Sequence, residues 1–256
     1  MGKAENLDAM IREHLYHKKI GADHDFRWRG GDVTRLEGIA DGVFAITLTL
    51  LIVTGSGVTG FNEVWTMVRD LPAFLASFAL IMYIWLEHYK FFRRYGLIDA
   101  WSIFFNAAFL FIVMILAYPL KLLSTFLWYL IIGVSTEPLF VTTENSMEAI
   151  APIMQRQYMM YFYGTVIIGV FGILMLMHVN AWGKRQLLEL DELEKLTTLQ
   201  AITHHGFSTL VGLLSIIVLW FSKNPGLSGV VYFLMPILHP FIAFIFIKKI
   251  NSRKRD

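Results

Sequence analysis

Residues 34–53 read TRLEGIADGVFAITLTLLIV, an apolar stretch that carries an arginine, a glutamate and an aspartate in its first two turns. Its length matches the roughly 20 residues that a helix needs to cross a bilayer. Ionisable groups inside a membrane span are costly and usually mark function. Thr34 followed by Glu37 is a capping-box pattern, which predicts that a helix begins at about Thr34. We therefore expect this segment, which occurs once in the chain, to be a membrane-spanning helix that carries residues important for function.

The composition is that of a membrane protein. The chain has 256 residues, of which 56% are hydrophobic and 16% charged, and its mean hydropathy is +0.55. Soluble domains carry about 25% charged residues, so this chain has too little polar surface to coat a water-soluble globule. The absence of cysteine excludes disulfides, thiolate metal sites and cysteine nucleophiles. No apolar segment follows Met1 closely, so a cleaved signal peptide is not expected.

Six apolar segments are each close to the length of a membrane span. They cover approximately residues 35–54, 72–92, 100–120, 161–179, 206–222 and 228–247. Apolar character continues past the third segment, so residues 122–134 either prolong that helix beyond the bilayer or lie along its surface. Ahead of the first span, apolar residues at helical spacing between Leu7 and Ile20 predict a short amphipathic helix.

The placement of lysine and arginine predicts the orientation. Residues 1–33 hold six of them, 90–94 three, 184–195 three and 248–255 five, which places 17 of the 22 on one side of the membrane. The opposite side has only Arg69, Arg156 and Lys223. Both termini are therefore predicted to be cytoplasmic. The expected organisation is a cytoplasmic N-terminal segment (1–33), a six-helix transmembrane domain (34–248) and a basic cytoplasmic tail (249–256).

Three polar residues fall at a similar depth, on the cytoplasmic side of the bilayer centre. Asp41 lies in the first span, His88 near the end of the second and Asn106 near the start of the third. Because buried polar groups in lipid need partners, we predict an interhelical network of these three residues, extended by Trp85 and Arg35. The alternative is that each faces headgroups independently, which is the favoured interpretation for Glu87.

Helical periodicity divides the first span into two faces. At about 100° per residue, one face carries Arg35, Gly42, Ile46, Thr49, Leu50 and Val53. Asp41 lies on a different side of the helix. It is therefore predicted to anchor helix packing rather than to line a pathway with the first set, although ordinary lipid or helix contact would also explain an apolar face.

Residues 35–51 resemble the first-helix signature of the prokaryotic relatives of transmembrane protein 175, the lysosomal potassium channel. The family pattern is an arginine, three residues and then Phe-Ser-Asp. Arg35 and Asp41 match it, whereas Ile39 and Ala40 replace the phenylalanine and serine. Further matches to family positions are Trp85, His88 and Asn106.

The resemblance implies an all-α membrane protein that forms a homotetrameric, modestly selective potassium channel in the cell membrane, with the first helix of each copy lining a central pore. It implies a hydrophobic constriction or gate at Ile46, Leu50 and Val53. It implies that Thr49 supports selectivity, with potassium passing near its hydroxyl. Arg35, Asp41, Trp85, His88 and Asn106 would form the interhelical network. The implied partners are other copies of the chain, the bilayer and monovalent cations, with no cofactor and no nucleic acid.

The main alternative is a proton- or ion-coupled transporter that uses Asp41 and His88. Such carriers usually show internal repeats and helices broken near the midplane, and neither is evident here. A membrane enzyme is not expected, because His178, His204 and His205 lack a metal-ligand spacing such as His-Glu-x-x-His. A purely structural scaffold would leave the polar residues of the first span unexplained.

Overall fold

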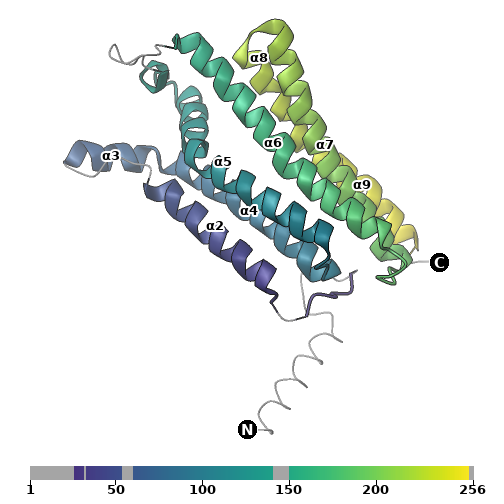
Figure 1. Cartoon of the computed structure of the whole chain (residues 1–256). Helices are drawn as coiled ribbons and strands as arrows, with labels where there is room; N and C mark the ends of the chain where they lie inside the picture. The colour runs from purple at the N-terminus through teal and green to yellow at the C-terminus, as the bar shows by residue number, and fades with distance from the viewer. Residues whose placement is uncertain (1–25, 32, 54–59, 141–149, 254–256) are drawn as a thin grey trace, which may run out of the picture.

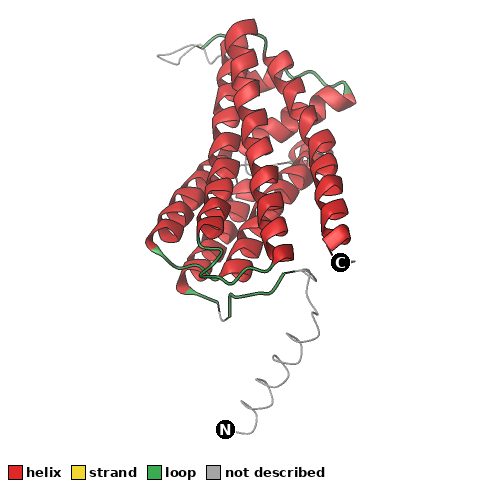
Figure 2. Ribbon diagram, turned by 90° about the vertical axis from the view of Figure 1, so that its right-hand side faces the viewer, coloured by secondary structure: helices red, strands yellow, loops and turns green. Residues whose placement is uncertain are grey.

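A computed structural model describes residues 26–31, 33–53, 60–140 and 150–253. These residues form helices and loops and contain no strand, so the all-α prediction is confirmed for the part of the chain that is described (Figures 1 and 2). The amphipathic helix predicted between Leu7 and Ile20 lies outside the described residues.

The bundle contains two groups of helices. The first comprises α2 (Arg35–Val53), α4 (Leu71–Tyr95) and α5 (Ala100–Ile132), which pack on one another. The second comprises α6 (Pro152–Gly183), α7 (Glu192–Ser222) and α9 (Met235–Arg253), and α6 with α7 forms the most extensive helix pair of the fold. Contacts of α6 with α5 and α4 join the groups, so that α2 and α9 lie at opposite sides of the bundle (Figure 1).

The helix pair α6–α7 is close because small residues face each other. A Cβ atom added to Gly212 would lie 3.3 Å from the backbone oxygen of Gly164 and 3.1 Å from side-chain atoms of Ile167 and Ile168. Small residues at such positions let membrane helices approach closely and gain packing contacts. Through α6, this pair packs against α5 and α4.

The helix α5 is longer than one membrane span. It begins at the N-cap Asp99, contains Pro119 and ends at Gly133, which has a φ of 70°. Proline lacks an amide hydrogen and disturbs a helix interior, and α5 changes direction along its length (Figure 1). The hydroxyl of Tyr163 donates a hydrogen bond to the Pro119 carbonyl. Residues 122–132 therefore belong to the same helix as the third apolar segment, whereas their position relative to the bilayer stays a prediction.

Several helix boundaries differ from the sequence prediction. The helix α6 begins at Pro152 rather than near residue 161, because Pro152 occupies the first helical turn, where its missing amide is no loss. The helix α7 begins at Glu192 rather than near residue 206, because Asp191 and Glu194 form a capping box. The polar turns that precede each apolar run are helical and extend beyond the span itself.

Two of the connections between the long helices contain further helical turns. Between α2 and α4 lies α3 (Phe61–Arg69), and α8 (Pro225–Val230) with the 3-10 turn η2 (Val231–Leu234) precedes α9. A second 3-10 turn, η1 (Glu137–Phe140), follows α5. Hydrogen bonds from Trp128 to the Arg69 carbonyl at 2.9 Å and from Tyr129 to Asp70 at 3.2 Å tie the α3–α4 junction to the end of α5.

Five helical segments among the described residues are long and apolar enough to cross a membrane. They are 71–95, 100–117, 152–183, 192–222 and 225–253. The 19-residue helix α2 is not among these five and ends where the described residues stop. The chain is thus a multi-pass helical membrane protein, while the count of six spans and the cytoplasmic location of both termini stay predictions.

Candidate functional site

The helix α2 has one buried face and one exposed face. The buried stripe consists of Glu37, Ala40, Phe44, Thr47 and Leu51, at the spacing of a helix that packs against a core. It packs on α4 and α5. The Thr34–Glu37 capping box predicted from the sequence is confirmed, because the Thr34 amide donates to Glu37 Oε2 at 2.9 Å and the Glu37 amide donates to Thr34 Oγ1 at 3.2 Å.

The residues predicted to face a pore lie on the exposed side of the single chain. Ile46 is 54% exposed and Leu50 is 36% exposed, whereas Phe44 is 3% exposed and Leu51 is fully buried. Arg35, Gly42 and Thr49 are exposed on the same chain. Val53 is the last residue of α2, and its side chain lies outside the described part.

The hydroxyl hydrogen of the threonine on this face is already used in a hydrogen bond. Thr49 Oγ1 donates to the Ala45 carbonyl at 2.8 Å, one turn earlier. A hydroxyl that donates to the backbone keeps its oxygen lone pairs available to accept a hydrogen bond or to coordinate a cation. Thr47 makes the same bond, to the Val43 carbonyl at 2.8 Å, but it is completely buried. The two threonines therefore differ in accessibility and share their local geometry.

Asp41 is connected to α4 through an indole. Trp85 Nε1 donates to Asp41 Oδ1 at 2.9 Å. The Trp85 ring also stacks on Tyr89, with 5.5 Å between ring centroids, so packing one turn further along α4 orients the donor.

His88 and Asn106 form a second polar pair. His88 Nε2 lies 2.6 Å from Asn106 Oδ1, and both side chains are buried. The imidazole stacks on Phe109 at 5.2 Å and contacts Phe44 of α2 at 6.0 Å, centroid to centroid. This pair ties α4 to α5 and supplies an aromatic surface against which α2 packs.

The predicted network is thus present as two separate pairs in the described part of the chain. Trp85–Asp41 joins α4 to α2, and His88–Asn106 joins α4 to α5. No hydrogen bond between the two pairs, and no ion pair to Arg35, is present among the described residues.

Glu37 makes an interhelical contact that the sequence reasoning missed. Besides capping α2, its Oε1 lies 3.8 Å from Arg93 Nε at the end of α4, which is an ion-pair distance but too long for a hydrogen bond. Arg93 Nη1 also donates to the Gly31 carbonyl at 2.6 Å. An acidic first turn and a basic end of the next antiparallel span were the available sequence signals for this contact.

Residues 26–31 form a segment that we call the N-terminal clasp, because it holds the end of α4 against the start of α7. The backbone amides of Arg29 and Gly30 donate to the Arg93 carbonyl at 3.1 and 3.0 Å. A Cβ atom at Gly30 would lie only 2.5 Å from the Phe92 carbonyl oxygen. Glycine is therefore required at this position, where the clasp packs directly against the backbone of α4.

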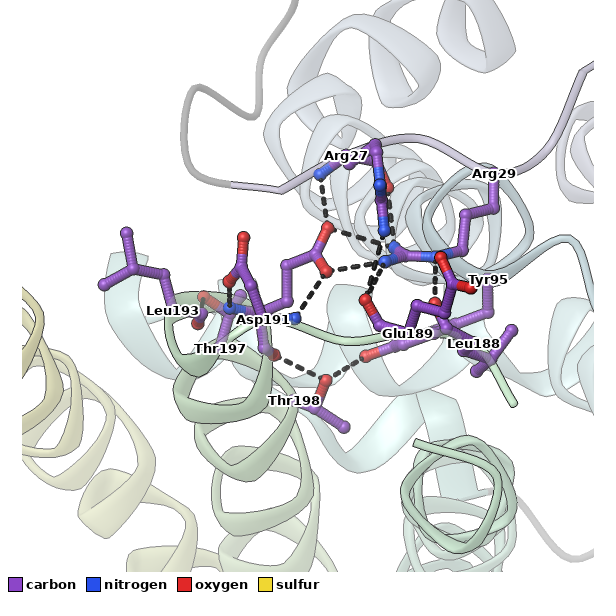
Figure 3. Close-up of polar contacts among 10 residues, drawn as sticks. Arg27, Arg29, Tyr95, Leu188, Glu189, Asp191, Leu193, Thr197 and Thr198 are labelled. Carbon is purple, nitrogen blue, oxygen red and sulfur yellow. Dashed lines mark hydrogen bonds and ion pairs between the residues drawn. The ribbon is translucent and has the colours of Figure 1, made fainter. Parts of the chain in front are cut away.

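The clasp is fixed to α7 by a buried carboxylate (Figure 3). Glu194 accepts hydrogen bonds from Arg29 Nη2 at 2.6 Å and Nη1 at 3.0 Å, and from the Arg27 amide at 2.8 Å. Its carboxylate also accepts from the Asp191 amide at 3.0 Å to complete the capping box. The side chain is 1% exposed. The Glu194 carboxylate therefore takes part in the capping box at the start of α7 and also binds the N-terminal clasp, which leads into α2.

A further bond fastens α4 to α7 beside the clasp (Figure 3). Thr198 Oγ1 donates to the Glu194 carbonyl at 2.8 Å and lies 2.8 Å from the Tyr95 hydroxyl. Both side chains are buried. The same end of the bundle therefore collects the start of α2, the end of α4 and the start of α7, and we call it the basic end because Arg29, Arg93 and Lys184 lie there.

At the basic end, an ion pair also joins α5 to α6. Lys184 Nζ lies 2.6 Å from Asp99 Oδ2, and Asn180 Nδ2 is 3.4 Å from Asp99 Oδ1. Burial acts to raise the pKa of Asp99, but hydrogen bonds from Lys184, Ser102 and Asn180 outweigh it and lower the pKa to about 2. Because this folded-state pKa is below the ordinary value, the stabilisation is complete above about pH 4 and is lost as the pH falls toward 2.

The histidines named in the sequence analysis come together with a fourth. Ring centroids of His178 and His205 are 5.2 Å apart, those of His204 and His205 are 5.4 Å apart, and His239 of α9 lies 3.9 Å from His204. The described residues contain no group of three or more His, Cys, Asp or Glu that is arranged to hold a metal ion.

The Trp85–Asp41 bond is expected to contribute to the stability of the protein rather than to its ion selectivity. Asp41→Ala is expected to destabilise the assembled protein by about 1 kcal/mol, a typical value for an interhelical hydrogen bond in a membrane, and to leave ion selectivity nearly unchanged. Thermal unfolding in detergent should show Asp41→Ala and Trp85→Phe to be strongly non-additive, because each removes the same bond. Additive effects, or a changed potassium-to-sodium ratio with an intact assembly, would place Asp41 in the ion pathway.

Fold and site together define a multi-pass helical membrane protein in which the helix α2 presents an exposed face of apolar side chains and a threonine. The family model described as the endosomal/lysosomal potassium channel TMEM175 matches residues 35–117. A potassium channel from Marivirga tractuosa is 32% identical over 230 residues, which cover 88% of this chain and 92% of the relative. The chain belongs to the TMEM175 family.

Two solved structures are similar to this chain. A crystal structure of a variant of the potassium channel MtTMEM175, in complex with a nanobody–MBP fusion protein, matches with a TM-score of 0.71 and 31% identity, over 87% of this chain and 97% of that one. A structure of a lysosomal potassium-selective channel TMEM175 homologue from Chamaesiphon minutus shares the fold, with a TM-score of 0.51 at 20% identity over 83% and 96% of the two chains.

These comparisons confirm the family predicted from the sequence and its functional class, a potassium channel rather than an enzyme. The family model ends at residue 117, within α5. It covers α2 and α4 completely, so the residues from Arg35 to Asn106 on which the resemblance was based lie inside the matched region.

Proposed function

We propose that this chain forms a modestly selective potassium channel in a cell membrane, by assembling as a homotetramer in which α2 of each copy lines the central pore. The observation that carries the proposal is the exposed face of α2, where Ile46, Thr49 and Leu50 are open to the surroundings of the single chain while the opposite face is buried. The α2 sequence occurs once in the chain, so a closed pore lined by it requires several copies, and cyclic symmetry closes it most simply.

In the proposed pore, Ile46, Leu50 and Val53 form the constriction. Rings of branched aliphatic side chains exclude water from a narrow passage, and modest widening lets a hydrated or partly hydrated ion pass. The Thr49 hydroxyls, whose hydrogens are bound to the Ala45 carbonyls, turn oxygen lone pairs toward the permeant ion. Because few oxygens are fixed in place, selectivity is expected to be modest compared with that of a carbonyl cage.

The coupled-transporter alternative receives no support from the geometry of its two residues. His88 Nε2 is occupied by Asn106, and the imidazole is buried between aromatic rings. Asp41 is bound by Trp85. A proton relay would need these two groups to exchange a proton, whereas each is held by a separate partner.

Thr49→Ala tests the selectivity assignment with a matched control on the same helix. In liposomes that contain the reconstituted protein, Thr49→Ala is expected to lower the potassium-over-sodium flux ratio severalfold, because a ring of oxygen ligands is lost. Thr47→Ala removes the same type of hydroxyl and the same backbone bond from the buried face, and it should leave the ratio unchanged. Equal ratios in both variants and wild type would contradict the pore assignment of this face.

A further inference from the structure

A polar cavity of about 250 Å³ lies between α4 and α7, toward the basic end of the bundle. Its walls are polar and ionisable side chains from both helices: Glu87, Lys90 and Arg94 from α4, and Gln200, His204 and His205 from α7. The α4 residues occupy the last turns of that helix, immediately before its end at Tyr95. None of these residues belongs to the proposed pore face.

One wall of the cavity contains a buried side chain that lacks a hydrogen-bonding partner. His205 is fully buried, and neither of its ring nitrogens has a hydrogen bond within the described part of the chain. Glu87 Oε2 lies 3.6 Å from His205 Nε2, close enough for electrostatic attraction but too far for a hydrogen bond. Buried polar groups without a partner are rare and call for an explanation, such as an ion or ligand that supplies the missing bond.

The charges around the cavity favour an anion that carries several oxygens. Lys90 and Arg94 bring two positive charges, and Glu87, the carboxylate among the described lining residues, already accepts a bond from Lys90 Nζ at 2.9 Å. The imidazoles and the Gln200 amide add neutral N–H donors. A metal cation would be repelled by Lys90 and Arg94, whereas phosphate oxygens can accept from several of these donors at once, including the His205 ring nitrogen that has no hydrogen bond within the described residues.

We propose that this cavity binds a phosphate group, either from the headgroup of an anionic phospholipid or as soluble phosphate. Basic pockets between membrane helices at the cytoplasmic side are a recurrent way of binding lipid headgroups. The phosphate oxygens accept from Lys90, Arg94 and His205, and so satisfy the buried imidazole. The bound group bridges α4, which carries Trp85 and His88, to α7. The proposal does not depend on α2 lining a pore.

Two variants of the full chain test the site by different means. Lys90→Gln removes a positive charge at the wall, and Ala201→Leu fills space at a small residue that lines the cavity while leaving every polar group in place. Lys195→Gln is the control, because Lys195 lies on α7 but is paired with Glu192 at 2.8 Å and does not line the cavity.

Inorganic phosphate is titrated into detergent-purified protein at constant ionic strength, with binding followed by calorimetry. In parallel, native mass spectrometry counts the phosphatidylglycerol retained by protein from nanodiscs of phosphatidylglycerol and phosphatidylcholine.

The expected result is saturable binding to wild type and to Lys195→Gln that is at least about tenfold weaker in both cavity variants, since a charge-assisted hydrogen bond accounts for a factor of that order. If Lys90→Gln loses the retained phosphatidylglycerol, the phosphate group comes from a lipid headgroup. If the cavity variants weaken only the binding of inorganic phosphate, the ligand is soluble phosphate. If neither probe binds, or if both cavity variants bind as well as the control, the cavity holds only water and the proposal is overturned.

Discussion

Replacing Ile46 or Leu50 with asparagine is expected to raise the resting potassium flux of the reconstituted protein about tenfold or more. In the proposed tetramer, each substitution places a ring of amides where a ring of branched aliphatics stood. Amides hold water, so the constriction can no longer dewet. A reduction of only about 1.4 kcal/mol in the barrier to permeation increases the rate tenfold, and four amides act together on that barrier.

The measurement is potassium efflux from liposomes, normalised to the amount of assembled protein. Leu213→Asn supplies the control, because Leu213 is 46% exposed on α7, and α7 packs on α6 and α9 rather than on α2. This variant carries the same chemical change in another span and should conduct like wild type. If Ile46→Asn and Leu50→Asn conduct no more than Leu213→Asn, then this face of α2 does not line the pore.

The largest effect on stability is expected from Glu194→Ala. This change removes the partner of Arg29, the acceptor for the Arg27 amide and half of the α7 capping box at once. Removing one partner of a buried ion pair costs about 3–5 kcal/mol, and we expect a value near the lower limit because the Arg29 side chain is 14% exposed. The N-terminal clasp should then detach from α7.

The apparent melting temperature in detergent, followed by tryptophan fluorescence, should fall by roughly 6–12 °C in Glu194→Ala. Glu192→Ala is the matched control, because Glu192 lies two residues earlier with a 67% exposed side chain paired to Lys195. An exposed pair of this kind contributes little, so the control should melt close to wild type. Indistinguishable melting of the two variants would show that the clasp does not contribute to the stability of the bundle.

Much of the architecture could be predicted from local patterns. Apolar run length identified each segment around which a long helix forms, and the Thr34–Glu37 pattern located the start of α2, because both signals act within one or two helical turns. The starts of α6 and α7 were placed too late, since hydropathy detects the part of a helix in contact with lipid. The capping signals of Pro152 and Asp191, which mark the true starts, lie in polar sequence.

The candidate site also contains some features that could be predicted from the sequence and others that could not. Spacing alone separated Asp41 from the face that carries Ile46, Thr49 and Leu50, and depth alone suggested that Asp41, His88 and Asn106 lie at one level. The sequence predicted a network of these residues but not which side chains pair, because Trp85 and Asp41 are 44 residues apart and the Arg27–Glu194 contact spans 167. Glu37 with Arg93, and Glu87 with His205, were missed for the same reason.

Composition, the 3.6-residue period and a local signature are properties of neighbouring residues. They were therefore enough to identify a helical membrane protein, the residues of α2 that share a face and the family of the chain. Tertiary packing determines which face of α2 is buried, which polar groups are paired and where a polar cavity opens between α4 and α7. Those features depend on contacts between helices that are distant in the sequence, where the free energy of packing and of satisfying buried polar groups selects one arrangement among many that the local pattern permits.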